Sequence, residues 1–201
     1  MPKAVLVFNT ASTALERKLA GRELAHEWRW SELDEVDEAA GGATRAQRDA
    51  LTLLAVFLQH SDSKPVQQRI VCVEEGENGC AVPMMIIHDL GMTFGAANAF
   101  NGSSTGSVNL AHWERRPVWK DAPGCIGNLS SSMTGTLKDP VISEDGRQFL
   151  ANLMSQLSDQ QIFDMFDVAH VDLRGHAAPI DRWVSAFTAK RAEIADRRCP
   201  S

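Results

Sequence analysis

A predicted β-hairpin near the middle of the chain constrains the fold more than any other feature. Residues 69–75 and 82–88 are rich in β-branched and other apolar side chains, and Asn78-Gly79 between them favours a tight turn. A polar or acidic segment flanks each end of the hairpin: residues 60–67 read His-Ser-Asp-Ser-Lys-Pro-Val-Gln, and residues 89–91 read Asp-Leu-Gly. We therefore expect one carboxylate in a loop before the hairpin and a second at the end of its returning strand.

Helical patterns cover much of the remaining sequence. Thr44 is a suitable N-cap for a helix over 45–59, in which apolar residues recur at spacings of three and four. A further helix is expected over 31–39, because acidic residues fill its first turn and Gly41-Gly42 follow its end. Capping residues also precede three predicted C-terminal helices: Ser143 before 144–157, Ser158 before 159–168 and Pro179 before 180–196.

Two more segments complete the predicted fold. Residues 4–8 are apolar and predict a short buried strand, and Pro83 suits the start of a strand or an edge strand. Residues 91–140 hold many glycines and serines and predict a long, mostly irregular segment. We therefore expect an α+β, mainly helical fold with a small β-hairpin and a long irregular loop, divided into an N-terminal segment over 1–30 and a single domain over 31–201.

The composition argues against several classes of protein. The net charge is −6 and no basic stripe is visible, so we expect no nucleic-acid partner. No apolar run reaches the about 18 residues of a membrane-spanning helix, so no membrane partner is expected. The apolar run over 4–8 is shorter than the about 7–15 residues of a signal-peptide core. As written, the chain is expected in the cytoplasm, or in the periplasm if a signal peptide precedes it.

The cysteine spacing leaves two interpretations open. The chain has four cysteines and none of them forms a C-x-x-C pair, which argues against a zinc site. Cys72 and Cys80 fall on opposite arms of the predicted hairpin and could face each other as a disulfide. They could equally be reduced, buried thiols in a cytosolic protein, and the sequence does not choose between the two compartments.

The order of these elements resembles the C-terminal lobe of the protein-kinase-like superfamily. In that lobe a long helix leads into the catalytic loop, and two short strands lead to the metal-binding Asp of the D-F-G motif. The catalytic-loop pattern H-x-D-x-K-P-x-N is matched at His60, Asp62, Lys64 and Pro65, with Gln67 in place of Asn. The stretch from Asp89 to Gly95 (D-L-G-M-T-F-G) is also similar to uncharacterised bacterial kinase-like proteins, with Leu90 in place of the Phe and Gly91 matching the glycine.

The resemblance implies a role for each matched residue. Asp62 would be the catalytic base, Lys64 would steady the γ-phosphate of ATP, and His60 completes the catalytic set, although a His here also suits a helix C-terminus. Asp89 would bind the principal divalent cation, and Gln67 would take the second metal position. Mg²⁺ is the expected ion, with Ca²⁺ or Mn²⁺ as alternatives, because all three prefer oxygen ligands. The phosphoryl acceptor, a small molecule or a protein, is not indicated.

One part of the kinase pattern is missing from the sequence. A kinase needs a glycine-rich loop over the phosphates and a strand lysine paired with a helix glutamate. The residues before 31 contain no G-x-G-x-x-G and no convincing strand lysine. We therefore expect either that the N-terminal lobe is supplied by another segment or a partner chain, or that ATP is not the ligand.

A serine hydrolase is a second candidate function. The pattern G-x-S-x-G occurs over 102–106 with Ser104 as the candidate nucleophile, but the flanking residues predict neither the strand nor the helix of a hydrolase elbow. His112, His170 and His176 could each serve as its base, and nothing selects one of them. A flexible Gly/Ser loop is the competing interpretation of the same residues.

A metal-dependent hydrolase and a non-catalytic binding module are the two remaining candidate functions. Asp62, Asp89, His60 and His88 could together hold an ion that activates water for ester or lactone hydrolysis, although His88 should point to the opposite face of its strand. The absence of an N-terminal lobe from the sequence pattern would be consistent with a binding module. Its docking surface could include Trp113 and Trp119, which flank a basic pair in the sequence, unless these rings are buried.

Overall fold

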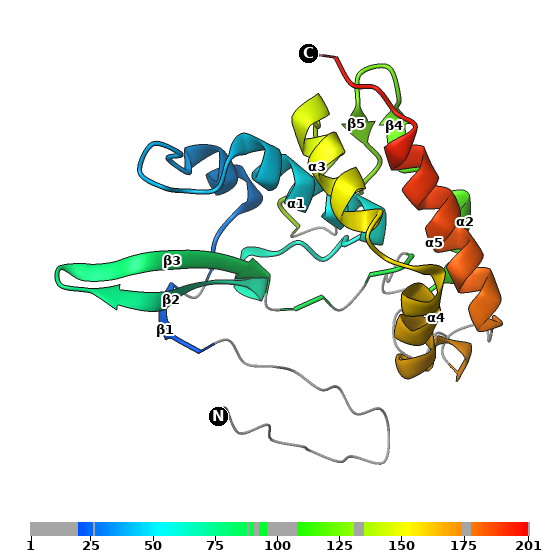
Figure 1. Cartoon of the computed structure of the whole chain (residues 1–201), viewed down its shortest axis with the longest axis horizontal. Helices are drawn as coiled ribbons and strands as arrows, with labels where there is room; N and C mark the ends of the chain where they lie inside the picture. The colour runs from blue at the N-terminus through cyan, green and yellow to red at the C-terminus, as the bar shows by residue number, and fades with distance from the viewer. Residues whose placement is uncertain are drawn as a thin grey trace.

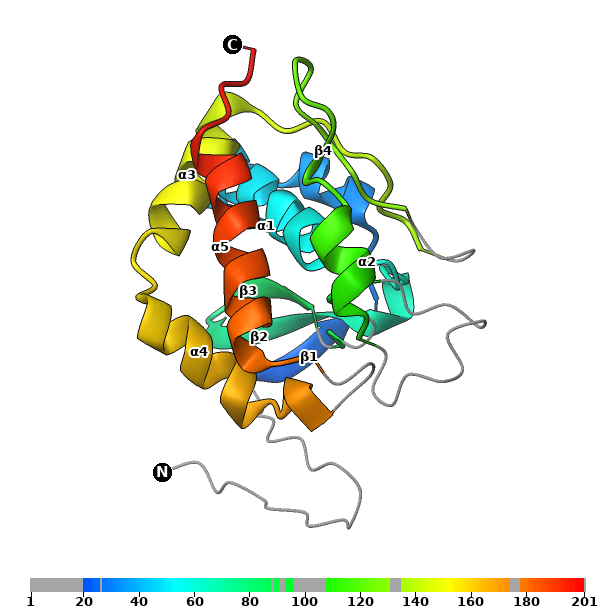
Figure 2. The same ribbon diagram turned by 90° about the vertical axis from the view of Figure 1, so that its right-hand side faces the viewer.

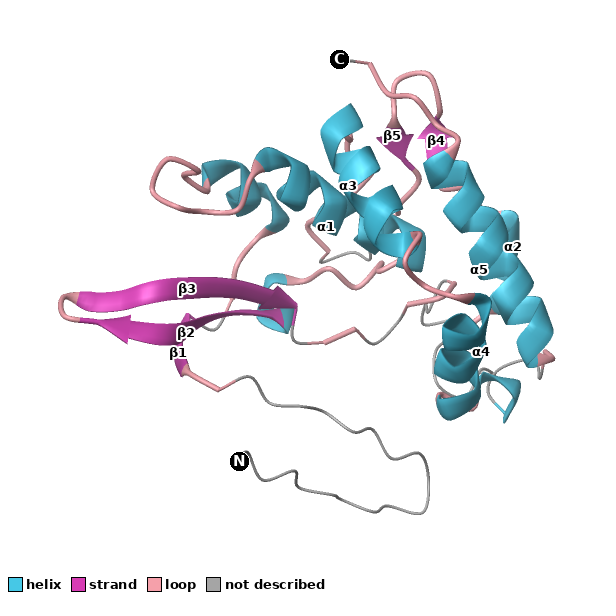
Figure 3. Cartoon of the chain, in the orientation of Figure 1, coloured by secondary structure: helices cyan, strands magenta, loops and turns pink. Residues whose placement is uncertain are grey.

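The computed structural model describes residues 20–25, 27–87, 89–90, 93–95, 108–130, 135–173 and 178–200. Helices gather on one side, and a long antiparallel hairpin projects from them (Figure 1). Colouring by secondary structure shows that helix predominates over strand (Figure 3). The expectation of an α+β, mainly helical protein is therefore confirmed at the level of fold class. None of the described helices is long and apolar enough to span a bilayer.

The regular elements of the described residues are five α-helices, five strands and three short 3₁₀ helices. The strands are β1 (Arg22–Ala25), β2 (Gln68–Gly76), β3 (Gly79–Ile87), β4 (Trp119–Asp121) and β5 (Ile126–Gly127). The α-helices are α1 (Arg45–Leu58), α2 (Leu110–Arg115), α3 (Glu144–Met154), α4 (Asp159–Val168) and α5 (Ile180–Ala195). The 3₁₀ helices are η1 (Trp30–Glu35), η2 (Pro65–Gln67) and η3 (Val171–Leu173).

The predicted hairpin is confirmed and forms most of the sheet. Strands β2 and β3 pair in antiparallel register around the turn at Glu77-Asn78, and β1 pairs with the other edge of β2. The strand order β1-β2-β3 leaves β3 at an edge, as Pro83 indicates. A disulfide joins Cys72 to Cys80 across the hairpin, with their Cα atoms 5.6 Å apart. Of the two interpretations of these cysteines, the structure therefore has the oxidised one.

The predicted caps begin the main helices. Thr44 Oγ1 accepts from the Gln47 amide at the start of α1, and the Gln47 side chain accepts in return from the Thr44 amide. Ser143, Ser158 and Pro179 precede α3, α4 and α5 as expected. Helix α1 packs against α3, and α5 packs against α2, α3 and α4 (Figure 2). The core between them is rich in buried aromatic rings: Phe57, Trp113, Phe166, Trp183 and Phe187.

The helix expected over 31–39 is wrong. The chain forms only the 3₁₀ helix η1 there, and its cap Val36 is already extended, with ψ of 120°. Trp30 and Leu33 are the two residues of η1 that are buried, so the segment lacks the apolar stripe of an α-helix. The many carboxylates beyond Leu33 would also repel one another on a helix surface.

The segment expected to be irregular, 91–140, contains short elements in its described parts. Helix α2 and the two-stranded sheet of β4 and β5 lie within it. Trp113 and Trp119 are buried in the core, so they anchor this segment and do not form a docking surface. A second disulfide joins Cys125, in the turn between β4 and β5, to Cys199 near the C-terminus.

The described residues among the first 30 are joined to the sheet and the core. Strand β1 pairs with β2, and the rings of Trp28 and Trp30 are buried in the core. Trp28 Nε1 lies 3.2 Å from both the Arg69 and the Ile86 carbonyl oxygens, which ties this segment to the hairpin. The strand expected over 4–8 lies outside the described residues.

Candidate functional site

The loop that carries Asp62 begins where α1 ends. Gln59 adopts the left-handed conformation, with φ of 57°, and turns the chain away from the helix axis. Its side-chain amide donates to the carbonyl oxygens of Val56, at 2.9 Å, and Asn128, at 2.8 Å. The His60 amide donates to Ala55 O at 2.9 Å. The start of the loop is therefore fixed to the helix on one side and to the segment after β5 on the other.

Ser63 holds the middle of the loop in the protein interior. The Ser63 carbonyl accepts hydrogen bonds from the backbone amide and the hydroxyl of Thr136, at 3.0 and 3.1 Å. Its hydroxyl accepts from the Leu137 amide at 3.1 Å. Because Ser63 is fully buried, these bonds satisfy groups that water cannot reach. They fix the backbone on which Asp62 and Lys64 lie.

Asp62 is the centre of the candidate site. Its carboxylate is buried, with the residue 4% exposed, and two side chains of the same loop contact it. Lys64 Nζ lies 2.9 Å from Oδ1, and Gln67 Nε2 donates to Oδ2 at 2.8 Å. The 3₁₀ helix η2, with Pro65 at its first position, turns the chain so that Gln67 returns to Asp62. Three of the sequence-predicted residues are therefore in direct contact.

Asp89 is placed next to this loop by the hairpin. Its backbone amide donates to the Gln67 carbonyl at 3.3 Å, which continues the β2–β3 pairing beyond the end of β3. After Asp89 the chain is fixed again, because the Phe94 amide donates to Leu58 O at 2.6 Å and the Phe94 ring packs on Trp113. Asp62 and Asp89 thus lie on segments that are joined to each other and to the end of α1.

A glycine is required where this segment turns back into the core. Gly95 has a φ of +100°, and a Cβ atom at this position would lie 2.1 Å from Asn109 O. Only glycine combines this backbone conformation with so close an approach to a neighbouring carbonyl. The backbone conformation therefore explains why the last residue of the D-L-G-M-T-F-G stretch is a glycine, which the sequence pattern alone does not explain.

His60 is buried beside both carboxylates. Its ring is 0% exposed and lies 6.4 Å from Trp30, centroid to centroid. Burial lowers the pKa of His60 below its ordinary value, and the charges of Asp62 and Asp89 oppose this effect without reversing it. The charges of both carboxylates therefore affect the pKa of this one ring. A fully buried neutral ring can position the loop.

The oxygen atoms beside Asp62 decide whether a divalent cation fits the site. Gln67 Oε1 is buried and accepts no hydrogen bond from the described residues, while the nitrogen of the same amide is used on Asp62. An amide oxygen and the Asp89 carboxylate are ligands that suit Mg²⁺, which usually takes one or two protein carboxylates and completes its shell with phosphate and water. Among the described residues, no three His, Cys, Asp or Glu side chains form a metal-binding cluster.

The remaining sequence-predicted residues are only partly described by the structure. Ser104 with its G-x-S-x-G pattern, His88, Gly91 and His176 lie outside the described residues. His112 lies on α2, where burial lowers its pKa, and His170 follows α4.

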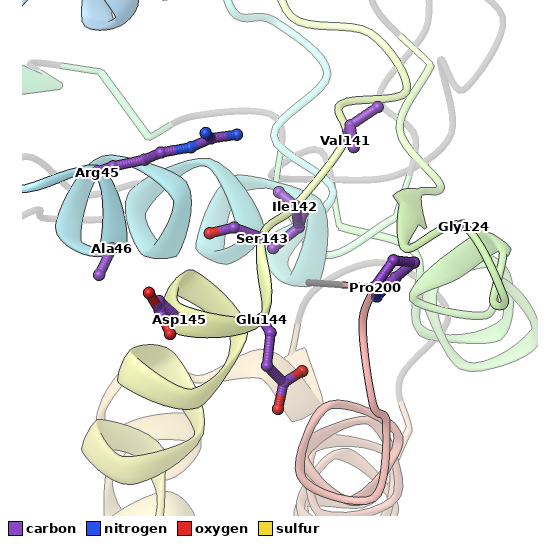
Figure 4. A pocket seen from close by; sticks show the side chains of 9 residues that line it. All are labelled: Arg45, Ala46, Gly124, Val141, Ile142, Ser143, Glu144, Asp145 and Pro200. Atoms are coloured by element: carbon purple, nitrogen blue, oxygen red, sulfur yellow. The ribbon is translucent and has the colours of Figure 1, made fainter.

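A broad hollow lies at the start of α3, remote in sequence from the Asp62 loop (Figure 4). Its volume is about 630 Å³, and Ser143, Glu144 and Asp145 line it together with Arg45 and Pro200. Glu144 accepts from Arg147 and from the Cys199 amide, and these bonds hold its pKa well below the ordinary range. The Glu144 carboxylate therefore holds the C-terminal segment and is not a candidate for catalysis.

Gln59 and Ser63 support the site, and no sequence pattern singles them out. Their partners, Asn128, Thr136 and Leu137, lie about 70 residues further along the chain. No local motif marks such long-range contacts.

Comparison of the chain with protein families, with curated proteins and with solved structures finds no match.

Proposed function

We propose that the protein has a kinase-like phosphoryl-transfer site built on Asp62, Lys64, Gln67 and Asp89. The observation that carries this proposal is the buried Asp62 carboxylate, which has Lys64 on one oxygen and Gln67 on the other. Phosphoryl transfer needs a carboxylate to orient a hydroxyl, and a cation beside it for the charge on the transferred group. Three residues within one short loop supply both.

In the proposed reaction, Asp62 accepts the proton of an acceptor hydroxyl as its oxygen bonds to the γ-phosphorus of ATP. The bond from that phosphorus to the bridging oxygen breaks, and ADP leaves. Lys64, which pairs with Asp62 in the resting site, is within reach of the transferred group and offsets its negative charge. His60 is a positioning residue, because its ring is fully buried at the start of the loop.

Asp89 and Gln67 are the residues that would hold a divalent cation. Bound there, Mg²⁺ would neutralise the phosphates of the nucleotide, which is the chemistry that these oxygen ligands favour. The sequence has no glycine-rich phosphate loop. In this proposal the cover over the nucleotide therefore comes from a partner chain or from residues outside the described part.

The test is consumption of ATP in the presence of Mg²⁺ by the full chain, purified together with any partner chain that remains bound to it, read as ADP formed or phosphate gained by an acceptor. We expect Asp62→Asn and Lys64→Met each to reduce turnover at least about a hundredfold, since a positioned general base contributes about 10²–10⁴-fold. Asp164→Asn, an exposed carboxylate on α4, is the matched control and should leave turnover unchanged. Folded protein that neither binds nor consumes Mg-ATP would overturn the proposal.

We also propose that the protein resides in an oxidising compartment in place of the cytoplasm. All four cysteines are paired in the two disulfides, and paired cysteines persist mainly in oxidising compartments. Alkylation of the protein isolated without reductant tests this, because the proposal predicts no accessible thiol. Four alkylated cysteines would contradict it.

A further inference from the structure

A cavity separates α1 from β3 beside the candidate site. In Figure 1 the hairpin runs beneath α1, and the cavity between them has a volume of about 270 Å³. Leucines of α1 form one wall, and Met85 and Ile87 of β3 form the other. Leu90, which is 53% exposed, closes one side and borders solvent.

The wall of this cavity is almost entirely apolar. Its one titratable residue is His60, and burial keeps that ring neutral. A charged group placed here would lose its hydration without gaining a partner, which is unfavourable. An apolar group would be stabilised by the removal of its surface from water. The cavity therefore favours uncharged, hydrophobic ligands.

The cavity and the candidate site share two short stretches of chain. His60 lies two residues before Asp62, a span of at most about 7 Å. Leu90 directly follows Asp89. A molecule whose body lies between α1 and β3 is therefore bordered by residues that are at most two positions away from Asp62 and Asp89 in the chain.

The size of the cavity limits what can fill it. Ligand pockets usually measure about 300–1,000 Å³, so this cavity, at about 270 Å³, is slightly smaller than that range. It accommodates a single ring or a short branched chain, and it is too small for an extended lipid tail.

We propose that this cavity binds the hydrophobic body of the phosphoryl acceptor, and that the acceptor is a small uncharged alcohol with an apolar ring or chain. This assignment rests on the phosphoryl-transfer function proposed above. The alcohol oxygen would reach Asp62, which takes its proton, while the apolar body lies against Leu54, Leu58 and Met85. Sugars, amino acids and charged metabolites would be poor acceptors.

Binding is tested first, without nucleotide, by ligand-observed NMR with benzyl alcohol as the probe and benzoate as its charged counterpart. We expect saturable binding of benzyl alcohol alone. Leu90→Gln and Met85→Gln change two residues of the wall and should each weaken binding at least about fivefold. Met84→Gln is the matched control, since Met84 is adjacent in β3, is exposed and does not line the cavity. Absence of saturable binding to folded protein, or equal effects of Met84→Gln and Met85→Gln, would overturn the proposal.

Transfer is tested next, with Mg-ATP and either benzyl alcohol or glycerol as acceptor. The proposal predicts at least about tenfold faster phosphorylation of benzyl alcohol, and a loss of this preference in Leu90→Gln. Glycerol phosphorylated as fast as benzyl alcohol would overturn the acceptor assignment and leave phosphoryl transfer standing. Benzyl alcohol that binds while no acceptor is phosphorylated would instead overturn the proposed function, and the acceptor assignment with it.

Discussion

At the scale of single residues, the buried Asp62 carboxylate depends on the donors that the loop provides. A carboxylate removed from water is stable only when charged or hydrogen-bonding groups replace its hydration. The spacing of two and five residues to Lys64 and Gln67, with Pro65 starting a 3₁₀ turn between them, delivers both donors locally. All three participants lie within six residues, so the sequence motif could select them together as candidates, although it does not predict their contacts.

Replacing Gln67 with leucine tests the hydrogen bond to Asp62. Gln67→Leu keeps most of the side-chain volume but removes the amide donor to Oδ2. Hydrogen bonds to charged groups contribute about 1.5–3 kcal/mol, so the free energy of unfolding in urea should fall by about 2 kcal/mol. Gln148→Leu, which removes an exposed donor to Glu144, should cost less than about 0.5 kcal/mol. Equal losses of unfolding free energy in the two variants would show that the buried Gln67–Asp62 hydrogen bond contributes no more than an exposed one.

The neutral His60 ring predicts how stability depends on pH. Burial lowers its pKa in the folded protein, so the unfolded chain takes up a proton more readily. The contribution of the neutral His60 ring to stability is complete above about pH 6.5, the pKa of histidine in the unfolded chain. It is lost as the pH falls below that value. Urea unfolding should therefore give a smaller free energy at about pH 5.5 than at about pH 7.5.

His60→Phe should reduce this pH dependence, because it removes the group that titrates. His112, whose pKa burial also lowers, remains in both proteins, so the comparison isolates His60. If the free energy of unfolding differs between the two pH values as much in His60→Phe as in the unchanged protein, His60 is not the group responsible.

At the scale of elements, α1 holds the start of the site loop and depends on its N-cap. Thr44→Ala removes the capping bond to Gln47 and should lower the unfolding free energy by about 1 kcal/mol. Thr52→Ala lies within the same helix, where alanine has the better helix propensity, and should cost nothing or stabilise slightly. Thermal or urea unfolding of both variants measures the difference. A larger loss from Thr52→Ala than from Thr44→Ala would contradict the capping role.

The elements that the sequence predicts well are those with local signals. The N-caps of α1, α3 and α4 and the Asn-Gly turn each specify their element within four residues. The 31–39 segment has a similar acidic start but no apolar stripe, so its capping pattern alone is not enough to make a helix. Strand β1 has only four residues and no alternation to mark it, so its pairing with β2 has no sequence signal.

At the scale of the whole molecule, two disulfides constrain loops of very different length. The Cys72–Cys80 bond spans 8 residues and Cys125–Cys199 spans 74. Loop-closure entropy gives contributions of about 2.5 and about 4.4 kcal/mol, respectively. We therefore expect the Cys125→Ser/Cys199→Ser pair to lower the unfolding free energy more than the Cys72→Ser/Cys80→Ser pair, measured in urea. The reverse order would contradict the tethering role of the C-terminal bond.

Long-range contacts account for what the sequence could not predict. Cys125 and Cys199 carry no spacing signal, and Gln59 and Ser63 find their partners on the segments after β5. The partners in these contacts lie about 70 residues apart, so no local sequence pattern identifies them. The loop motif could thus be predicted, whereas its support and the apolar cavity beside it required the three-dimensional structure.

The central claim is that Asp89 and the Asp62 loop form one cation-assisted site. Its most direct test is a crystal structure grown with Mn²⁺ and a non-hydrolysable ATP analogue, in which anomalous scattering locates the ion. We predict a manganese peak coordinated by the Asp89 carboxylate and the Gln67 amide oxygen, with the nucleotide γ-phosphate beside Lys64. Nucleotide and manganese bound away from these residues, or a diffraction-quality crystal with neither bound, would contradict the account.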